Sequence, residues 1–170
     1  GSAVLERASR PSIAVLPFAV AGDAGAHAAL AHALPQELIT ELSRLRWLFV
    51  IARGSSFRLR LGETGYDDIG RLLGARYCLT GTMEVVAGHL AVDVELVDTR
   101  DSGVVWAERV SRLVEDIHAV REEISARVLT ALEIRIPLHE AGLARHVSPE
   151  SLDAWSAYHV GLQHMYRFNR

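Results

Sequence analysis

The chain has 170 residues, 49% of them hydrophobic, and a formal net charge of -3 at pH 7. This length predicts one domain, or one domain with part of a second, and enough apolar side chains to fill a core. All 18 basic residues are arginine, which excludes a Walker-type phosphate-binding lysine, a Schiff-base lysine and a lysine general base. The charge balance gives no global sign of nucleic-acid binding.

The cysteine count and the hydropathy of the chain indicate the cellular compartment in which the domain would fold. Cys78 is the single cysteine, so no internal disulfide can form and the fold needs no oxidising compartment. No apolar run approaches the roughly 20 residues that span a bilayer, and no signal-peptide pattern opens the chain. These features predict a cytoplasmic domain without membrane contact. Gly1-Ser2 is typical of a tag remnant, and residues 1–10 are expected to be a frayed leader.

The first half of the chain alternates predicted strands with predicted helices. Residues 12–18 (SIAVLPF) are apolar and partly β-branched, which predicts a buried strand. Leucines recur at helical spacing over residues 30–45, with Pro35 among them. Either the helix kinks at Pro35, or a main helix begins there with the proline in its first turn. Residues 47–52 (WLFVIA) predict a second buried strand.

A loop over residues 53–65 is expected next, with room for one helical turn at SSFRL. Residues 66–73 predict a short helix, which Gly74 ends as a C-terminal glycine. Three strands follow closely, and the alternation of apolar with polar residues in the first two predicts an antiparallel hairpin with one wet face. The three predicted strands cover residues 77–85, 90–97 and 104–110.

The last part of the chain has a helical pattern. An apolar stripe predicts a long amphipathic helix over about residues 114–134, which Pro137 ends. Residues 137–147 are a candidate linker. The sequence SPE at 148–150 then opens a final helix, with serine as the cap and proline in the first position.

The order of the predicted elements is βα-βα-βββ-α, followed by a separate C-terminal helix. The two βα units favour a parallel strand pair with right-handed crossovers, and the later meander favours antiparallel pairing. We therefore expect an α/β fold of the α+β-like kind, with a mixed five-stranded sheet and helices mainly on one face. The predicted domain covers residues 11–136, and residues 148–170 belong to a separate region.

The residues that could carry chemistry do not form a recognisable catalytic or metal-binding motif. The eight histidines lie in no zinc-binding pattern, and the pairs that are five residues apart would point about 140° apart on a helix. Cys78 lies in an apolar strand without an activating base, which favours inert packing. The sequence RGSSF around Ser55 and Ser56 is not a nucleophile elbow. We expect this segment to have no catalytic residue, metal or cofactor.

Charge is distributed unevenly along the chain. Residues 44–60 hold five arginines and no acid, whereas residues 93–123 hold nine acids against four arginines. Arginine suits carboxylate and phosphate groups, so the basic loop is a candidate anion-binding or contact surface. A solvated surface with local ion pairs is the plainer interpretation. Nucleic-acid contact is not expected, because exposed aromatic residues are not interleaved with the arginines. The candidate contact residues are Arg53, Ser55, Ser56, Arg58 and Arg60.

Several segments together resemble the TolB-like amino-terminal domain of bacterial multidomain regulators. They are PSIAVLPF, ELITELSRLRWLFVIARGSSF, IGRLLGARYCLTGTM, HLAVDVELVDTRDSGVVWAERV and EDIHAVREEISARVLTAL, within residues 11–132. The later sequence SLDAWSAYHVGLQHMYRF is similar to the first helix of a tetratricopeptide array, which the family commonly carries next. In that family the module typically follows an adenylate/guanylate cyclase domain or an OmpR-type winged-helix DNA-binding domain.

The resemblance implies a non-enzymatic regulatory and interaction domain of a bacterial signalling protein. Such a domain would couple an N-terminal output domain to C-terminal protein-binding repeats, and its partners would be proteins that bind the flanking domains or repeats. A homodimer, and cyclase activity of the parent protein, are left open. The alternative is a small-molecule or anion sensor with a pocket near the carboxyl ends of the first two strands, where Arg53, Ser55 and Ser56 would supply polar groups.

Overall fold

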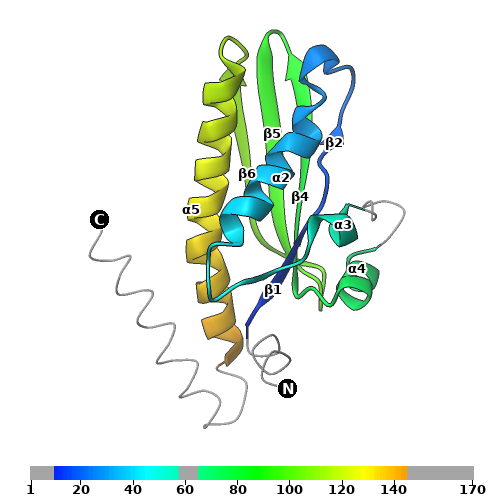
Figure 1. Cartoon of the computed structure of the whole chain (residues 1–170), viewed down its shortest axis with the longest axis vertical. Coiled ribbons are helices and arrows are strands. Elements are labelled where there is room, and N and C mark those ends of the chain that lie inside the picture. The colour runs from blue at the N-terminus through cyan, green and yellow to red at the C-terminus, as the bar shows by residue number, and fades with distance from the viewer. Residues whose placement is uncertain (1–9, 58–64, 145–170) are drawn as a thin grey trace, which may run out of the picture. The chain divides into compact units, whose positions relative to one another are not determined.

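The structure is a computed structural model that describes residues 10–57 and 65–144 (Figure 1). The chain divides into two compact units, residues 1–127 and 128–170, and each is described by itself. The elements are β1 Ser12–Val15, β2 Ala19–Val20, the 3-10 helix η1 Gly25–His27, α2 Leu30–Leu42, β3 Phe49–Val50, α3 Arg53–Ser56, α4 Tyr66–Leu73, β4 Tyr77–Val86, β5 His89–Asp98, β6 Gly103–Leu113 and α5 Ile117–Ala144.

One mixed sheet organises the first unit. Its strand order is β3-β1-β4-β5-β6, with β2 also pairing to β4. Strand β1 runs parallel to β3 and to β4, and β4, β5 and β6 form an antiparallel meander. The short β2 pairs with β4 beyond the end of β1, so β1 and β2 together occupy one position across the sheet. The predicted mixed sheet is confirmed. It has six strands where five were predicted, because the two-residue strand β2 follows β1 and pairs with the same neighbour, β4.

Pro17 explains why the predicted strand over residues 12–18 ends early, at Val15, and why β2 follows as a separate strand. A proline has no N–H to donate to a ladder. The N–H of Leu16 still donates to Leu79 O at 3.0 Å, but the N–H of Phe18 donates at 2.8 Å to Ala31 O of α2. The chain therefore leaves the sheet at Pro17 and rejoins it at β2.

Strand β1 is buried on both of its faces. All four of its residues are buried, and Ile13 and Val15 are fully so. Ala14 points to the opposite face from these two, where it packs with Ile51 and Ala75. Leu16 continues that face and packs with Ile69 of α4 and with Cys78. This pattern requires cover on both sides of the sheet at β1.

The long helices cover one face of the sheet. Figure 1 shows α2 lying across the strands. The first part of α5 joins the same layer, because Arg121 pairs with Glu37 of α2 at 2.9 Å. It also lies over β6, where Arg112 pairs with Glu123 at 2.7 Å. The short α4 covers one end of the opposite face, so the helices lie mainly on one face, as predicted.

Helix α2 begins at Leu30 and continues through Pro35 to Leu42. The alternative that a main helix begins at Pro35 is therefore wrong. A proline inside a helix leaves the carbonyl four residues earlier without its usual donor. Here that carbonyl belongs to Ala31, and it accepts the N–H of Phe18 instead. The missing helix bond is replaced by a bond that attaches the helix to the chain after β1.

Two further element boundaries differ from expectation. Helix α5 was expected to end at Pro137, and this is wrong, because it continues to Ala144 with the proline inside. Its apolar stripe extends past the predicted end, and Leu132 and Ile136 are both fully buried, so packing favours continued helix. The predicted final helix over residues 148–170 lies outside the described residues, and the predicted domain boundaries remain predictions.

The middle of the chain is close to expectation. The predicted strand over residues 47–52 pairs only through Phe49 and Val50. The helical turn in the following loop starts at Arg53, before the SSFRL sequence. Helix α4 has the predicted bounds, and Gly74 ends it in the left-handed conformation with φ 67°. The hairpin of β4 and β5 is confirmed, with the pairs running from Tyr77 opposite Asp98 to Val86 opposite His89.

Two helical glycines give a test of the packing of α4. A Cβ added at Gly70 would lie 2.6 Å from Thr99 Oγ1, so we expect Gly70→Ala to lower the free energy of unfolding, by roughly 1–3 kcal/mol. Gly142 of α5 has no heavy atom within 4 Å of the same position, so Gly142→Ala should raise it by roughly 0.5–1 kcal/mol. Urea denaturation measures both changes. A Gly70→Ala protein as stable as the wild type would contradict this packing.

Candidate functional site

The predicted basic loop is only partly described. Arg53 is the first residue of α3, and Ser55 is exposed. Ser56 is fully buried, and its hydroxyl donates to Ala52 O at 3.3 Å, so it is not accessible to a ligand in this conformation. Arg58 and Arg60 lie outside the described residues. A contact role for this loop remains a prediction.

A polar face lies on the side of the sheet opposite α2. The ladders place Thr80 opposite Glu95, and Thr82 opposite Asp93, which in turn lies opposite Arg109. Residues two apart on a strand, and partners across strands, share one face. This is the face that carries Cys78, and α4 covers only its end near that residue. We define the polar face by Thr80, Thr82, Glu84, Asp93, Glu95 and Arg109.

A pocket of about 1030 Å³ opens over the polar face. One side is formed by Pro17 and Phe18, directly after the carboxyl end of β1, and by His32 of α2. Tyr66 of α4 closes one end. The ring of His32 lies 5.8 Å from the ring of Phe57, which follows α3. The pocket therefore lies beside the carboxyl end of β1, and Ser55 and Ser56 are not among its lining residues.

Arg109 holds together the outer part of the polar face. Its guanidinium lies 2.8 Å from Glu84 Oε1 and 2.5 Å from Asp93 Oδ2. The hydrogen bond with Glu84 and the charge of Asp93 raise the pKa of Arg109 above its ordinary value. These side chains are partly exposed, so solvent screening leaves each pair little contribution to stability. The guanidinium of Arg109 nevertheless pairs with both carboxylates, those of Glu84 and Asp93.

Tyr66 connects α4 to the inner part of the polar face. Its hydroxyl lies 3.4 Å from Thr80 Oγ1 and donates to Glu95 Oε1, also at 3.4 Å. Both distances are long, since O–H···O bonds cluster near 2.7–2.8 Å. Burial, and then the negative charge of Glu95, raise the pKa of the Tyr66 hydroxyl, so it stays protonated at neutral pH. Within the described ranges 10–57 and 65–144, Glu95 makes no ion pair.

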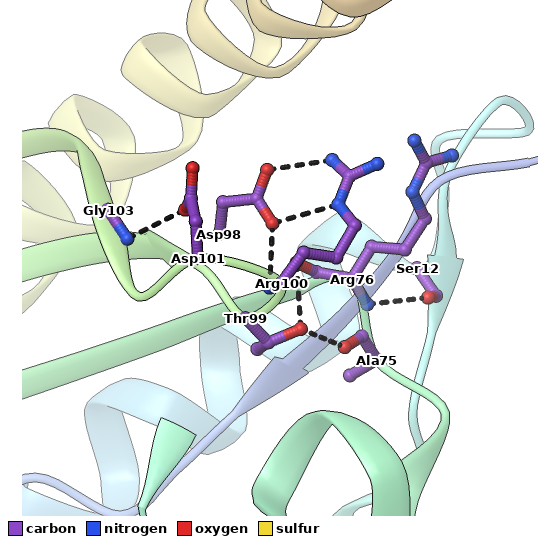
Figure 2. Close-up of polar contacts among 8 residues, drawn as sticks. All are labelled: Ser12, Ala75, Arg76, Asp98, Thr99, Arg100, Asp101 and Gly103. Carbon is purple, nitrogen blue, oxygen red and sulfur yellow. Dashed lines mark hydrogen bonds and ion pairs between the residues drawn. The ribbon is translucent and has the colours of Figure 1, made fainter. Parts of the chain in front are cut away.

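A second polar cluster lies at the other end of the sheet (Figure 2). Thr99 Oγ1 donates to Ala75 O at 2.6 Å, and the backbone N–H of Thr99 donates to Arg76 O at 2.9 Å. Ser12 Oγ donates to Gly74 O at 2.9 Å and accepts the N–H of Arg76 at 3.0 Å. These bonds join the start of β1, the turn between α4 and β4, and the end of β5. The cluster is structural.

The turn after β5 completes this cluster. The Asp98 carboxylate accepts bonds from Nε and Nη2 of Arg100, at 3.0 and 2.7 Å, and from the backbone N–H of Arg100. Asp101 Oδ1 accepts the N–H of Gly103 at 2.8 Å. Figure 2 shows the guanidinium groups of Arg76 and Arg100 side by side. Both line a shallow groove of about 560 Å³ that also includes Arg71.

Sequence reasoning proposed, as an alternative, a pocket near the carboxyl ends of the first two strands, but it assigned to that pocket none of the residues that line the observed one. It did not identify the polar cluster. Asp98 and Thr99 stood only just after the predicted strand over residues 90–97, and Tyr66 only at the start of a predicted helix. The one usable signal was the alternation of acids with apolar residues in β5, which correctly predicts a wet face. Of the described residues, no three or more His, Cys, Asp or Glu side chains lie where they could share a metal ion. No helix in the described part of the chain is long and apolar enough to span a membrane.

Cys78 is packed as predicted, and its chemistry can be tested. Burial raises the pKa of its thiol from the ordinary value of 9.0 to about 12. We expect the folded protein to resist a disulfide reagent at mildly alkaline pH and to react fully in denaturant, because only the thiolate attacks. The native state holds the thiol proton more tightly, so this group's contribution to stability is lost as pH rises from 9.0 toward 12. Rapid labelling of the folded protein would contradict the burial.

Comparisons with known proteins agree with this architecture. The sequence matches the family described as "HilA/YgeH-like transcriptional regulator, second domain" over residues 8–127. It is 34% identical over 148 residues to a Rhizobium meliloti (strain 1021) protein named "Putative adenylate cyclase 3", covering 85% of this chain and 25% of that protein. The chain therefore spans about a quarter of the length of this curated relative.

Solved structures share the fold. PelC from Paraburkholderia phytofirmans has a TM-score of 0.51 at 18% identity and covers 73% of this chain and 88% of its own. TolB from Acinetobacter baumannii has a TM-score of 0.50 at 20% identity, covering 72% and 28%. Lipoprotein GNA1162 from Neisseria meningitidis has a TM-score of 0.50 at 16% identity, covering 71% and 95%. The predicted TolB-like resemblance is confirmed for the fold. The chain belongs to the family of HilA/YgeH-like transcriptional regulator second domains.

Proposed function

We propose that this domain is a non-enzymatic regulatory and interaction module of a longer bacterial signalling protein. It couples an N-terminal output domain, either a cyclase or a DNA-binding domain, to C-terminal protein-binding repeats. The observation that carries the proposal is the family match over residues 8–127. The span of only a quarter of the cyclase-named relative fits a module that works beside other domains. A cytoplasmic location and protein partners that bind through the flanking regions are part of the proposal.

The chemistry of the described residues supports binding over turnover. A catalytic site needs a nucleophile or base with a suitable pKa and a group that orients it. The buried thiol of Cys78 is protonated at neutral pH, and Arg109 is held by Glu84 and Asp93. Tyr66 also keeps its proton. These groups are suited to recognition, since they present charge and hydrogen bonds without an activated nucleophile.

Helix α5 is the element best placed to carry a change of state, because its residues belong to both compact units. Within the first unit, ion pairs attach its opening turns to their neighbours. Arg112 forms a bidentate pair with Glu123, which lowers the pKa of that carboxyl. Arg127 pairs with Glu108 at 3.0 Å. Exposed pairs of this kind are weak, so the attachment can be released without unfolding the sheet.

The coupling can be tested in the full-length parent protein. We expect the double variant Arg112→Leu/Arg127→Leu to change the output severalfold, because it removes two attachments between β6 and α5 while costing little stability. The output is cyclic-nucleotide synthesis or promoter binding, according to the N-terminal domain. The matched control is Arg44→Leu, which removes the exposed pair between Arg44, just after α2, and Glu41 in its last turn. Unchanged output in a folded double variant would oppose the proposal.

A second candidate function is a small-molecule sensor. One observation favours it: the pocket over the polar face lies beside the carboxyl end of β1, where open α/β sheets commonly bind ligands. The two functions are compatible, since a ligand in this pocket would contact both α4 and the meander that supports α5. A thermal-shift screen separates a sensor from a purely mechanical coupler, because a specific ligand raises the melting temperature.

A further inference from the structure

The pocket over the polar face combines an apolar wall with a polar floor. The wall is formed by Pro17, Phe18 and Ala31, and the floor by Thr80 and Glu95. Its volume of about 1030 Å³ suits a small organic molecule, since ligand pockets commonly measure about 300–1,000 Å³. A wall and floor of this kind select a ligand with an apolar body and one polar or charged end.

The charges of the lining residues indicate the sign of that end. Arg109 is the arginine among them, and it is shared by Glu84 and Asp93. Glu108 is paired with Arg127. Glu95 has the Tyr66 hydroxyl as its hydrogen-bond donor and makes no ion pair in the part of the chain that the structure describes. Of the three acids that line the pocket, Asp93, Glu95 and Glu108, Glu95 is therefore the one without an ion pair among the described side chains.

The hydrogen bonds around Glu95 leave capacity for a ligand. Thr80 is only 8% exposed, and its hydroxyl lies at the long distance of 3.4 Å from the Tyr66 hydroxyl. A hydroxyl can donate once and accept twice, and an ammonium carries three donors. An ammonium at this point could donate to the Glu95 carboxylate and to the oxygens of Thr80 and Tyr66. Charge-assisted bonds of about 2.7–2.9 Å would replace these two long contacts.

Phe18 lines the edge of the pocket, but its ring does not face Glu95. An added Cβ at Gly81 would come within 2.9 Å of this ring, and Gly81 points to the face of β4 opposite Thr80. The aromatic ring on the side of Glu95 is that of Tyr66, which lines the pocket and reaches Glu95 through its hydroxyl. An aromatic ring there can pack against an apolar or aromatic body, and it also favours a nearby cation over an anion.

We propose that this pocket binds a small organic cation, a primary amine with an apolar or aromatic body, whose ammonium pairs with Glu95 while the body packs against the ring of Tyr66. This inference rests on the second candidate function, that of a sensor. An anionic ligand fits the same space poorly, because it would face Glu95 and Asp93 and find an arginine already held by two carboxylates. The basic groove lined by Arg71, Arg76 and Arg100 is a separate surface.

The test compares two probes of similar size and opposite charge. Isothermal titration of the whole chain with 2-phenylethylamine should show binding, whereas 3-phenylpropionate should bind at least about 10-fold more weakly. Glu95→Gln keeps the shape and removes the charge, so it should weaken the amine by about 10-fold or more. Glu41→Gln in α2, outside the pocket, should bind the amine as the wild type does.

The outcomes separate the inference from the functions on which it rests. Equal or tighter binding of 3-phenylpropionate, or amine binding unchanged by Glu95→Gln, would overturn the assignment of a cation at Glu95 while leaving a ligand pocket in place. No heat from either probe at millimolar concentration would overturn both the inference and the sensor. The coupling function is judged separately, by the output of the full-length Arg112→Leu/Arg127→Leu variant. Circular dichroism confirms that Glu95→Gln is folded before it is titrated.

Discussion

The burial of β1 on both faces is the constraint on which the rest of the fold depends. Ser12–Val15 lies between β3 and β4 and exposes almost nothing to solvent. A strand of this kind needs cover on each side, which α2 supplies on one face and α4 on the other. Ser12 also fixes the turn that follows α4, through its bonds to Gly74 O and to the N–H of Arg76. One short strand thus positions two helices and a turn.

The exit from β1 then shapes the pocket. Pro17 prevents the strand from continuing, and the N–H of Phe18 goes to the Ala31 carbonyl, which Pro35 cannot use. Two prolines that look like defects in a strand and a helix therefore compensate each other. The result is a break in the sheet edge beside β4, where the Phe18 ring packs against Gly81. This exchange of hydrogen-bond partners places Pro17 and Phe18 at the edge of the pocket.

The sequence predicts the fold well where periodicity is strong, and the site poorly. The alternation in β5 and the leucine spacing in α2 reflect local patterns that need no tertiary information. The prediction that α5 ends at Pro137 was wrong because packing, as well as helix propensity, decides where a helix ends. Ile136, the residue before this proline, is fully buried. The pocket joins Phe18, Tyr66 and Arg109, which are distant in sequence and meet only through the ladder registers. The arginine-rich loop was predicted as a contact surface from its charge, and charge alone does not show which side chains lie together in the fold.

We place ligand binding on the polar face beside the end of β1, and we propose that helix α5 transmits the resulting change of state to the flanking domains. The most direct test is a backbone amide NMR map of the isotopically labelled chain as 2-phenylethylamine is added. The account predicts the largest shifts at Phe18, Tyr66, Thr80 and Glu95, with little change across Arg71 and Arg100. Shifts confined to residues 53–60, or to the basic groove, would contradict it.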